Sequence, residues 1–469
     1  MNNWNNGTCG NHRYLLSRRD MLSGLSAGFG YMAFAGLSTA QAAAGTPLAS
    51  RRPHFLPKAK RVIFCCMRGG PSHVDTFDYK PALARDEGKQ LPKFRNRELM
   101  PSPWEFKQHG QGGLRISGLF PRLAEHADDL CLLNGMHSSG PAHPQSFLQL
   151  HTGSFQFVRP SMGAWVLYGL GTENRNLPGF IAMCPGGHPV KGPDNWRSSF
   201  LPGIFEGMYV NTEHTAVEKL IENIRNPRLD FAAQRRQLDL LQALNRKHLD
   251  ALGHDPQLES RIQSYEQAYR MQMEATDAFD VQREPEFIRE RYGKTTQARQ
   301  LLIARRLVER GVRFVQVWHG KWQPWDNHDE IEKNHRKLAQ ECSQGIAALI
   351  ADLKERGLFD ETLIILGGEF GRTPTVEITN AGKSKLGRDH NSAGFSMVLA
   401  GGGVKGGTVY GSTDEFGFQA AENPVHVHDL HATILHLMGF DHEKLTYRFA
   451  SRDFRLTDVH GNVIQDALA

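Results

Sequence analysis

Cysteine is scarce in this chain, and the few cysteines present form no recognisable redox or metal motif. The 469 residues contain six cysteines and no Cys-x-x-Cys pair. Five of the six lie beyond residue 44, and an odd number cannot all pair within one chain. Cys65 and Cys66 are adjacent within an apolar run that predicts a strand, where successive side chains point to opposite faces. We expect both to be buried as small hydrophobic side chains.

An excess of charge of one sign is also lacking. Lysine and arginine number 55 against 50 aspartates and glutamates, for a net charge of +5. No block of basic residues interleaved with aromatic residues occurs, so we expect no binding of nucleic acid. Beyond residue 44 no apolar run approaches membrane length, and we expect no stable membrane span in the mature protein. Hydrophobic residues at 40% and charged residues at 22% are typical of a globular protein.

The first 44 residues predict an export signal. Arg18 and Arg19 precede a weakly apolar run rich in glycine and alanine that ends at Ala44. A twin arginine in this position is the address of the twin-arginine (Tat) translocase, which carries folded cargo and often serves proteins that acquire a metal or cofactor in the cytoplasm. We therefore expect residues 1–44 to be a Tat signal peptide, cleaved near residue 43 or 45, and the protein to be periplasmic or otherwise extracytoplasmic.

Two alternatives for this segment are a plain secretory signal and a membrane anchor. The anchor fits poorly, because four glycines between Gly24 and Gly36 and several serines interrupt the run.

Short apolar runs alternate with helical patterns through the rest of the chain. Residues 61–67 form a continuous apolar run that ends at glycines, which predicts a strand buried on both faces. Similar runs predict strands at residues 130–134, 180–184, 313–318, 362–366 and 396–400. The clearest helical patterns cover residues 164–170, 334–356 and 428–438. This alternation predicts an α/β fold with a mostly parallel sheet, helices on both faces, and ligands at the carboxyl ends of the strands.

The segment from residue 215 to residue 310 differs in composition from its surroundings. It is rich in glutamine, arginine, glutamate and leucine and has few glycines. The pattern predicts three or four long amphipathic helices, inserted in the sheet domain or packed on it. We therefore expect a single domain over residues 58–460 with a helical insertion at residues 215–310.

Carboxylate and imidazole groups follow two of the predicted strands. Asp326 and His328 come after the strand at residues 313–318 and are two residues apart, so in an extended loop both side chains lie on the same side. Glu369 follows the strand at residues 362–366 between glycines, which let an anion approach the backbone closely. Arg372, three residues further on, offers a planar fork for a phosphate or sulfate group.

Further candidates lie in three other loops. Asp389 and His390 precede the strand at residues 396–400 and fit a ligand with its orienting partner. Ser72 lies in the first loop between strand and helix, where a helix cap is the more ordinary role and a nucleophile the alternative. Histidines gather at His137, His143 and His151, and Asp75 and Asp78 complete the set.

These segments together resemble a known group of proteins. The chain is similar to the exported bacterial proteins of the domain of unknown function 1501 family (DUF1501), within the alkaline phosphatase and sulfatase superfamily. The resemblance covers nearly the whole mature chain. The segments that carry it are residues 61–78, 367–374, 387–390, 399–407 and 427–439.

The resemblance implies an alkaline-phosphatase-like fold and a metal site at the carboxyl ends of the sheet. Carried over position by position, Asp326 and His328 are implied to be ligands of one ion, and His390 the later ligand histidine. Glu369 falls where an aspartate ligand is usual. Phe370 stands where these enzymes place a ligand histidine, and the first strand ends in Arg-Gly-Gly without the usual metal-binding aspartate.

The nucleophile departs further from the pattern. Sulfatases carry a cysteine or serine at the start of a stretch that here spans residues 143–153, and His143 stands in that place. The resemblance leaves an imidazole nucleophile, a metal-bound water or no nucleophile at all.

The leading hypothesis is an exported metal-dependent hydrolase that acts on a phosphate or sulfate ester of a small molecule or glycan. Zn²⁺ or Mn²⁺ suits the mixed ligands better than Mg²⁺ or Ca²⁺. His143 and Ser72 are the candidate catalytic groups, with Arg372 neutralising the oxyanion. The metal ligands are expected to be Asp326, His328, Glu369, Asp389 and His390. The alternative is a catalytically inactive member of the fold that acts as an extracytoplasmic binding or assembly protein.

Overall fold

The computed structural model describes residues 48–92, 96–174, 176–221, 228–252, 277–379, 382–383 and 386–469, with five positions between 262 and 270. The predicted signal peptide at residues 1–44 lies outside the described residues. Among the residues that are described, every helix is too short or too polar to cross a membrane.

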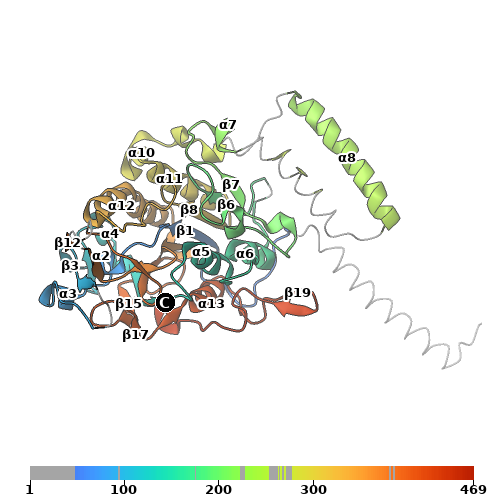
Figure 1. Cartoon of the computed structure of the whole chain (residues 1–469). Helices are drawn as coiled ribbons and strands as arrows, with labels where there is room; N and C mark the ends of the chain where they lie inside the picture. Colours follow the sequence, from blue (N-terminus) through green and yellow to red (C-terminus); the bar gives the residue numbers. More distant parts are fainter. Residues whose placement is uncertain are drawn as a thin grey trace, which may run out of the picture.

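A nine-stranded sheet forms the centre of the molecule (Figure 1). Its order is β15-β5-β14-β9-β1-β8-β6-β7, with β18 also paired to β5. Strand β14 is antiparallel to both of its neighbours, and the other pairs of this sheet are parallel. The strands are β1 (Arg61–Cys66), β5 (Leu130–His137), β6 (Phe180–Met183), β7 (Met208–Val210), β8 (Phe314–Trp318), β9 (Thr362–Gly367), β14 (Phe395–Ala400), β15 (Thr408–Tyr410) and β18 (Val425–His426).

The predicted mostly parallel sheet is confirmed. All six predicted strands are present, with ends shifted by one to three residues. Strands β7, β15 and β18 were not predicted, because runs of two or three residues are too short to show a periodicity.

Helices cover both faces of the sheet, as predicted. One face carries α5 (His143–Thr152), α6 (Met162–Leu170) and α13 (Val427–Leu437), and the other carries α10 (Glu286–Tyr292), α11 (Thr296–Glu309) and α12 (Ile331–Glu355). Figure 1 shows α10, α11 and α12 grouped on one side of β1 and β8. Alternate residues of β1 enter the two cores, so Ile63 packs with α11 and α12 while Phe64 packs with α5 and α6.

The cysteines behave as buried apolar side chains. All five that the structure describes are buried and unpaired. Cys65 belongs to the core on the α11 side and Cys66 to the core on the α5 side, so the expected opposite orientation is confirmed. Burial raises the pKa of the Cys65 thiol to about 12, which keeps it protonated and unreactive.

The segment at residues 215–310 contains helices of different kinds. Helix α8 (Phe231–Leu252) is long and lies apart from the sheet in Figure 1. Helix α11 instead packs against β8 and α12 and is buried along most of its length. Short α7 (Val217–Leu220) precedes α8. Residues 222–227 and most of 253–276 lie outside the described part, so the helical insertion and the domain boundaries stay predictions.

Small sheets support the loops at the carboxyl edge of the main sheet. Strand β10 (Gly371–Arg372) pairs with β13 (His390–Asn391), which sets Arg372 opposite His390. Strand β11 (Thr375–Thr379) pairs with both β2 (Arg97–Leu99) and β12 (Gly382–Lys383). The remaining pairs are β3 (Phe106–His109) with β4 (Leu114–Ser117), β16 (Ser412–Thr413) with β17 (Ala420–Glu422), and β19 (Tyr447–Phe449) with β20 (Arg452–Phe454).

Candidate metal centre

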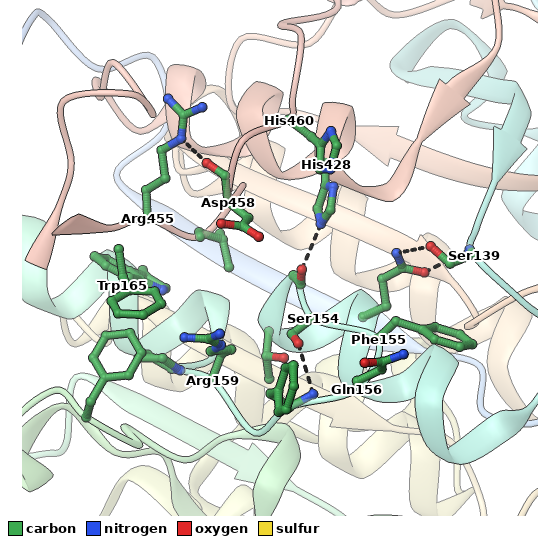
Figure 2. Close-up of a pocket in the computed structure, with 18 of the residues that line it drawn as sticks. Ser139, Ser154, Phe155, Gln156, Arg159, Trp165, His428, Arg455, Asp458 and His460 are labelled. Atoms are coloured by element: carbon green, nitrogen blue, oxygen red, sulfur yellow. Dashed lines mark hydrogen bonds between the residues drawn. The ribbon is translucent and has the colours of Figure 1, made fainter. Parts of the chain in front are cut away.

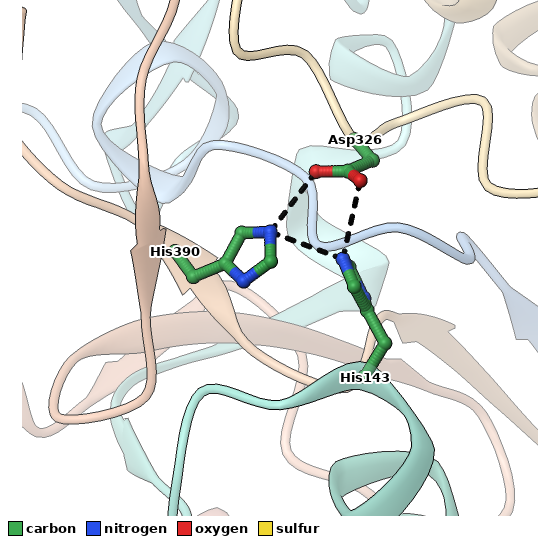
Figure 3. Close-up of side chains that lie close together, drawn as sticks. All are labelled: His143, Asp326 and His390. Carbon is green, nitrogen blue, oxygen red and sulfur yellow. Dashed lines mark hydrogen bonds and ion pairs between the residues drawn. The ribbon is translucent and has the colours of Figure 1, made fainter.

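Three side chains from distant parts of the chain converge at the carboxyl edge of the sheet (Figure 3). His143 Nε2 lies 3.3 Å from Asp326 Oδ2 and 3.1 Å from His390 Nε2. His390 Nε2 in turn lies 3.1 Å from Asp326 Oδ1. His143 begins α5 after β5, Asp326 follows β8, and His390 lies on β13. They meet because β5, β8 and β9 run parallel and so end at the same edge of the sheet.

His328 and Asp389 extend this cluster towards the solvent. His328 Nε2 lies 3.0 Å from both Asp326 Oδ1 and His390 Nε2. On its other side, His328 Nδ1 lies 3.8 Å from Asp389 Oδ1. His328, Asp389 and His390 therefore form a second group of potential ligands, which shares His390 with the first. The predicted same-side orientation of Asp326 and His328 is confirmed by their contact.

Hydrogen bonds on the outer side of two imidazoles fix which nitrogen carries the proton. His143 Nδ1 lies 2.5 Å from Glu369 Oε1, and His390 Nδ1 lies 2.9 Å from the carbonyl oxygen of Pro141. A carbonyl only accepts, and an ionised carboxylate only accepts, so both Nδ1 atoms donate. In the neutral rings the Nε2 lone pairs then face each other at 3.1 Å. Two lone pairs that face each other repel, whereas a cation between them can be coordinated by both. The arrangement of these side chains therefore fits a metal ion.

Glu369, which was predicted to be a metal ligand, lies behind His143 in the structure. The side chain is fully buried and belongs to neither group of converging atoms. Its two oxygens accept the backbone N–H of Gly69 at 3.1 and 3.2 Å, and one also accepts His143 Nδ1–H. Glu369 therefore orients His143 from behind, as a carboxylate behind a ligand histidine does.

Arg372, which was predicted to bind the oxyanion of a substrate, lies buried beside Asp326. The guanidinium is fully buried. Its Nε donates to the Gly70 carbonyl at 2.7 Å, and its terminal nitrogens donate to the carbonyls of Gly69 and Arg388. One terminal nitrogen also lies 2.7 Å from Asp326 Oδ1. Arg372 thus holds the loops together and neutralises Asp326, with four of its five N–H donors engaged within the protein.

The charges of the centre reinforce one another. Burial raises the pKa of Asp326, but the neighbouring imidazoles of His143, His328 and His390 and the Arg372 guanidinium outweigh this effect and hold the pKa well below its usual range. Burial lowers the pKa of His143, whereas the carboxylates of Asp326 and Glu369 raise it, and the net shift is upward. The cluster therefore carries an ionised carboxylate whose field favours a cation.

One side of the centre is closed and the other is open. Phe370 is buried, and its ring centroid lies 4.7 Å from that of His143 and 4.8 Å from that of His390. His328 is 50% exposed, and Asp326 and His390 are 26% and 22% exposed. An ion held here faces solvent on one side, which is typical of catalytic rather than structural metal sites.

A family model described as "Protein of unknown function (DUF1501)" matches residues 59–468. The chain belongs to the DUF1501 family. No curated protein matches this DUF1501 chain in sequence. Among solved structures, Ps i-CgsB in complex with k-i-k-neocarrahexaose is 12% identical, with a TM-score of 0.38, over 81% of this chain and 72% of its own.

Two further solved structures show the same distant likeness to the DUF1501 chain. The PsFucS1 sulfatase from Pseudoalteromonas sp. is 13% identical, with a TM-score of 0.35, over 84% of this chain and 69% of its own. The alkaline phosphatase from the Antarctic bacterium TAB5 is 8% identical, with a TM-score of 0.33, over 81% and 98%. At these TM-scores none of the three identifies an activity for the DUF1501 chain.

The remaining predicted residues of the DUF1501 chain lie in structural positions. Ser72 is buried and donates to Asp75 Oδ2 at 2.6 Å, and it makes no side-chain cap to α2 (His73–Thr76). Asp75 pairs with Arg388, and Asp78 accepts from Thr413. A role for Ser72 as nucleophile stays a prediction that the geometry does not favour.

Of the three clustered histidines, only His143 reaches the centre. His151 is fully buried against Phe64 and Trp318, and His137 packs beside His426. His143 was predicted as a catalytic group, but Glu369 holds its Nδ1 while Nε2 faces Asp326, which is the position of a ligand.

Two residues that support the centre of the DUF1501 chain were missed in the sequence. The Pro141 carbonyl holds His390, and Arg97 lies 2.5 Å from Asp389 Oδ2. No sequence signal marks a single backbone carbonyl, because every residue has one. Arg97 lies on a short strand remote in sequence from Asp389. His143 as a ligand was open to prediction, since it follows a strand as Asp326 does.

Proposed function

We propose that this protein is a metal-dependent hydrolase of phosphate or sulfate esters, exported by the twin-arginine route to work outside the cytoplasm. The observation that carries the proposal is the convergence of three imidazole Nε2 atoms on the Asp326 carboxylate, at 3.0 to 3.3 Å. His143, Asp326, His328 and His390 would hold the ion, with Asp389 behind His328.

The donor set favours particular metals. Three imidazole nitrogens with one carboxylate suit Zn²⁺ or Mn²⁺, whereas Mg²⁺ and Ca²⁺ prefer a shell made of oxygen atoms. A bound ion of this kind supplies a Lewis acid for an ester oxygen and for water.

The chain's own residues prepare the site for such chemistry. Glu369 and the Pro141 carbonyl keep both Nδ1 atoms protonated and both rings in place. Arg372 keeps Asp326 ionised, and Phe370 excludes water from the buried side. Water is the nucleophile that this arrangement supports, because His143 is oriented as a ligand and the Ser72 hydroxyl is engaged by Asp75.

The substrate class rests on the motifs that resemble alkaline phosphatases and sulfatases. The substrate would be a phosphate or sulfate ester of a small molecule or a glycan, bound on the open side where His328 is exposed.

The first experiment measures the metal content of the mature protein, purified without chelator from an export-competent host. Elemental analysis of the wild type and His390→Ala should find stoichiometric zinc or manganese in the wild type alone. The loaded wild type is then assayed on a panel of aryl phosphate and aryl sulfate esters. A protein that neither contains nor takes up metal would contradict the proposal.

A second candidate is an extracytoplasmic binding or assembly protein that retains the ion without catalysis. Burial of Arg372 favours it, because a guanidinium enclosed by the loops cannot reach a substrate oxyanion. Stoichiometric metal together with inactivity on every ester of the panel would favour this second function.

A further inference from the structure

A pocket lies beside the C-terminal end of α5, whereas the candidate metal centre lies at the N-terminal end of this helix. It measures about 480 Å³ and is lined by the last residues of α5, the segment that follows, α6 and the region of β20 (Figure 2). His143 begins α5 at the metal centre, and Thr152 ends the helix in the wall of the hollow. Ten helical residues at about 1.5 Å each separate the two places by roughly 15 Å. We call this hollow the arginine pocket.

The arginine pocket is basic. Three arginines line it, together with a single carboxylate. Arg452 pairs with that carboxylate, Asp458, and Arg455 donates to the Asp458 carbonyl and lies 3.1 Å from Glu443 Oε1. These two cations therefore already have partners.

Arg159 is different, because it has no hydrogen bond or ion pair with any residue that the structure describes. Its guanidinium carbon lies 4.4 Å from the ring centroid of Phe454 and 5.6 Å from that of Phe157. Figure 2 shows it within the hollow. Partial burial and the neighbouring Arg452 lower the pKa of Arg159, while Asp458 raises it. A half-buried guanidinium that contacts two rings and has no acceptor among the described residues leaves its N–H donors available to a ligand.

Flat aromatic faces and uncharged polar groups complete the lining. Phe157 is 62% exposed at the rim. Ser154, Gln156 and the Ser139–Gln149 pair, whose side chains bond at 2.6 Å, provide hydroxyl and amide groups. His428 is buried in the wall, where its Nε2 donates to the Gly153 carbonyl and its Nδ1 has no partner among the described residues.

We propose that the arginine pocket binds an anionic saccharide. A sugar ring would pack on Phe157, its hydroxyls would bond the serine and glutamine side chains, and its carboxylate or sulfate would pair with Arg159. Aromatic faces suit the apolar face of a sugar ring, and a guanidinium fork suits either anion. The proposal goes beyond the hydrolase function and does not depend on it, because no lining residue belongs to the metal centre.

Calorimetric titration of the mature protein tests this directly. The probes are an oligogalacturonate, its uncharged methyl-esterified form, a sulfated galactan oligosaccharide and AMP. At least one anionic saccharide should bind, and Arg159→Ala should weaken that binding at least about tenfold. If oligogalacturonate binds, methyl esterification should cause a similar loss. His390→Ala should leave binding unchanged, which separates this proposal from the hydrolase function.

The matched control is Arg115→Ala. Arg115 also stacks on an aromatic ring, with its guanidinium carbon 4.8 Å from the Tyr79 centroid, and does not line the pocket. Arg159→Gln, with its thermal unfolding compared to wild type, guards against a folding defect in the alanine variant. The proposal is wrong if neither anionic saccharide binds, or if both Arg159 variants bind like the wild type. It is also wrong if substitution of Arg159 weakens the binding of AMP but of none of the saccharides.

Discussion

Glu369 is placed to influence the affinity of the proposed metal centre although its carboxylate belongs to neither ligand group. It holds the Nδ1–H of His143 at 2.5 Å and is itself anchored by the Gly69 N–H. A carboxylate in this position makes the imidazole a better ligand and fixes its orientation.

Glu369→Gln should therefore weaken metal affinity by about tenfold to a hundredfold. The amide keeps the shape and one acceptor but loses the negative charge behind His143. A competition titration with a metal-binding dye measures the effect. The matched control is Glu341→Gln, because Glu341 also lies beside a histidine, His319 at 3.4 Å, but outside the centre. Equal affinities for wild type and Glu369→Gln would show that His143 is not a ligand.

His390 belongs to both groups of converging atoms, so its loss should be the most damaging of the single changes. We expect His390→Ala to abolish stoichiometric metal, and with it any ester hydrolysis. His109→Ala, which removes a half-buried histidine of β3, should retain both. Full occupancy in His390→Ala, measured by elemental analysis, would remove His390 from the ligand set.

At the scale of elements, the centre depends on loops that are tied to one another away from the ligands. Asp75 of α2 pairs with Arg388, just before β13, at 2.7 and 3.0 Å, and both side chains are fully buried. Burial raises the pKa of Asp75, but Arg388 and the Ser72 hydroxyl outweigh it and hold the pKa below its ordinary value. The pair therefore links the loop after β1 to the strand that carries His390.

Asp75→Asn should reduce the free energy of unfolding by about 3 to 5 kcal/mol, because it leaves Arg388 buried without its counter-charge. A depressed pKa in the folded state contributes stability above the unfolded-state value, about pH 3.9, and this contribution is lost as pH falls further. Denaturant unfolding at pH 7 and pH 3 should accordingly show a smaller difference between variant and wild type at pH 3. An equal difference at both pH values would argue against an ionised pair.

The strands and the loops at their ends differ in how well the sequence predicts them. The six main strands were predictable because each is a continuous run buried on both faces. Asp326, His328 and His390 could be predicted as ligands because they lie in loops at the carboxyl edge of such a sheet.

What the sequence could not show has a common physical cause. Glu369 and Arg372 have the residue types of a ligand and an anion binder, but their roles depend on burial, and burial of a loop residue is a tertiary property. Burial was equally hidden in α11, where Arg305 and Arg306 pair with buried carboxylates.

For the whole molecule, a bound ion joins α5, the loop after β8 and β13, and should stabilise the fold. At a free metal concentration a hundredfold above Kd, the gain is about 2.7 kcal/mol. Thermal unfolding of the wild type should shift upward on adding Zn²⁺ or Mn²⁺ to chelator-treated protein, while His390→Ala should not shift. An identical midpoint with and without metal would contradict the proposed centre.

The proposed export through the twin-arginine translocase also concerns the whole chain. Replacement of both Arg18 and Arg19 by lysine should block transport through the twin-arginine translocase and leave the precursor in the cytoplasm. Fractionation with immunoblotting measures this, and Arg13→Lys is the control outside the pair. Normal export of the double variant would indicate a general secretory signal instead.

His143 and His390 lie 247 positions apart in the chain. His143 is synthesised long before His390. A chain fragment that ends before β13 therefore lacks part of the proposed ligand set. The proposed ion could therefore be bound at the full site only after residue 390 has been synthesised and the edge of the sheet has formed. If the precursor folds in the cytoplasm and crosses the membrane intact, the identity of its metal is set by the metals available in the cytoplasm. The metals available outside the cytoplasm, where the protein would act, would then have no influence on it.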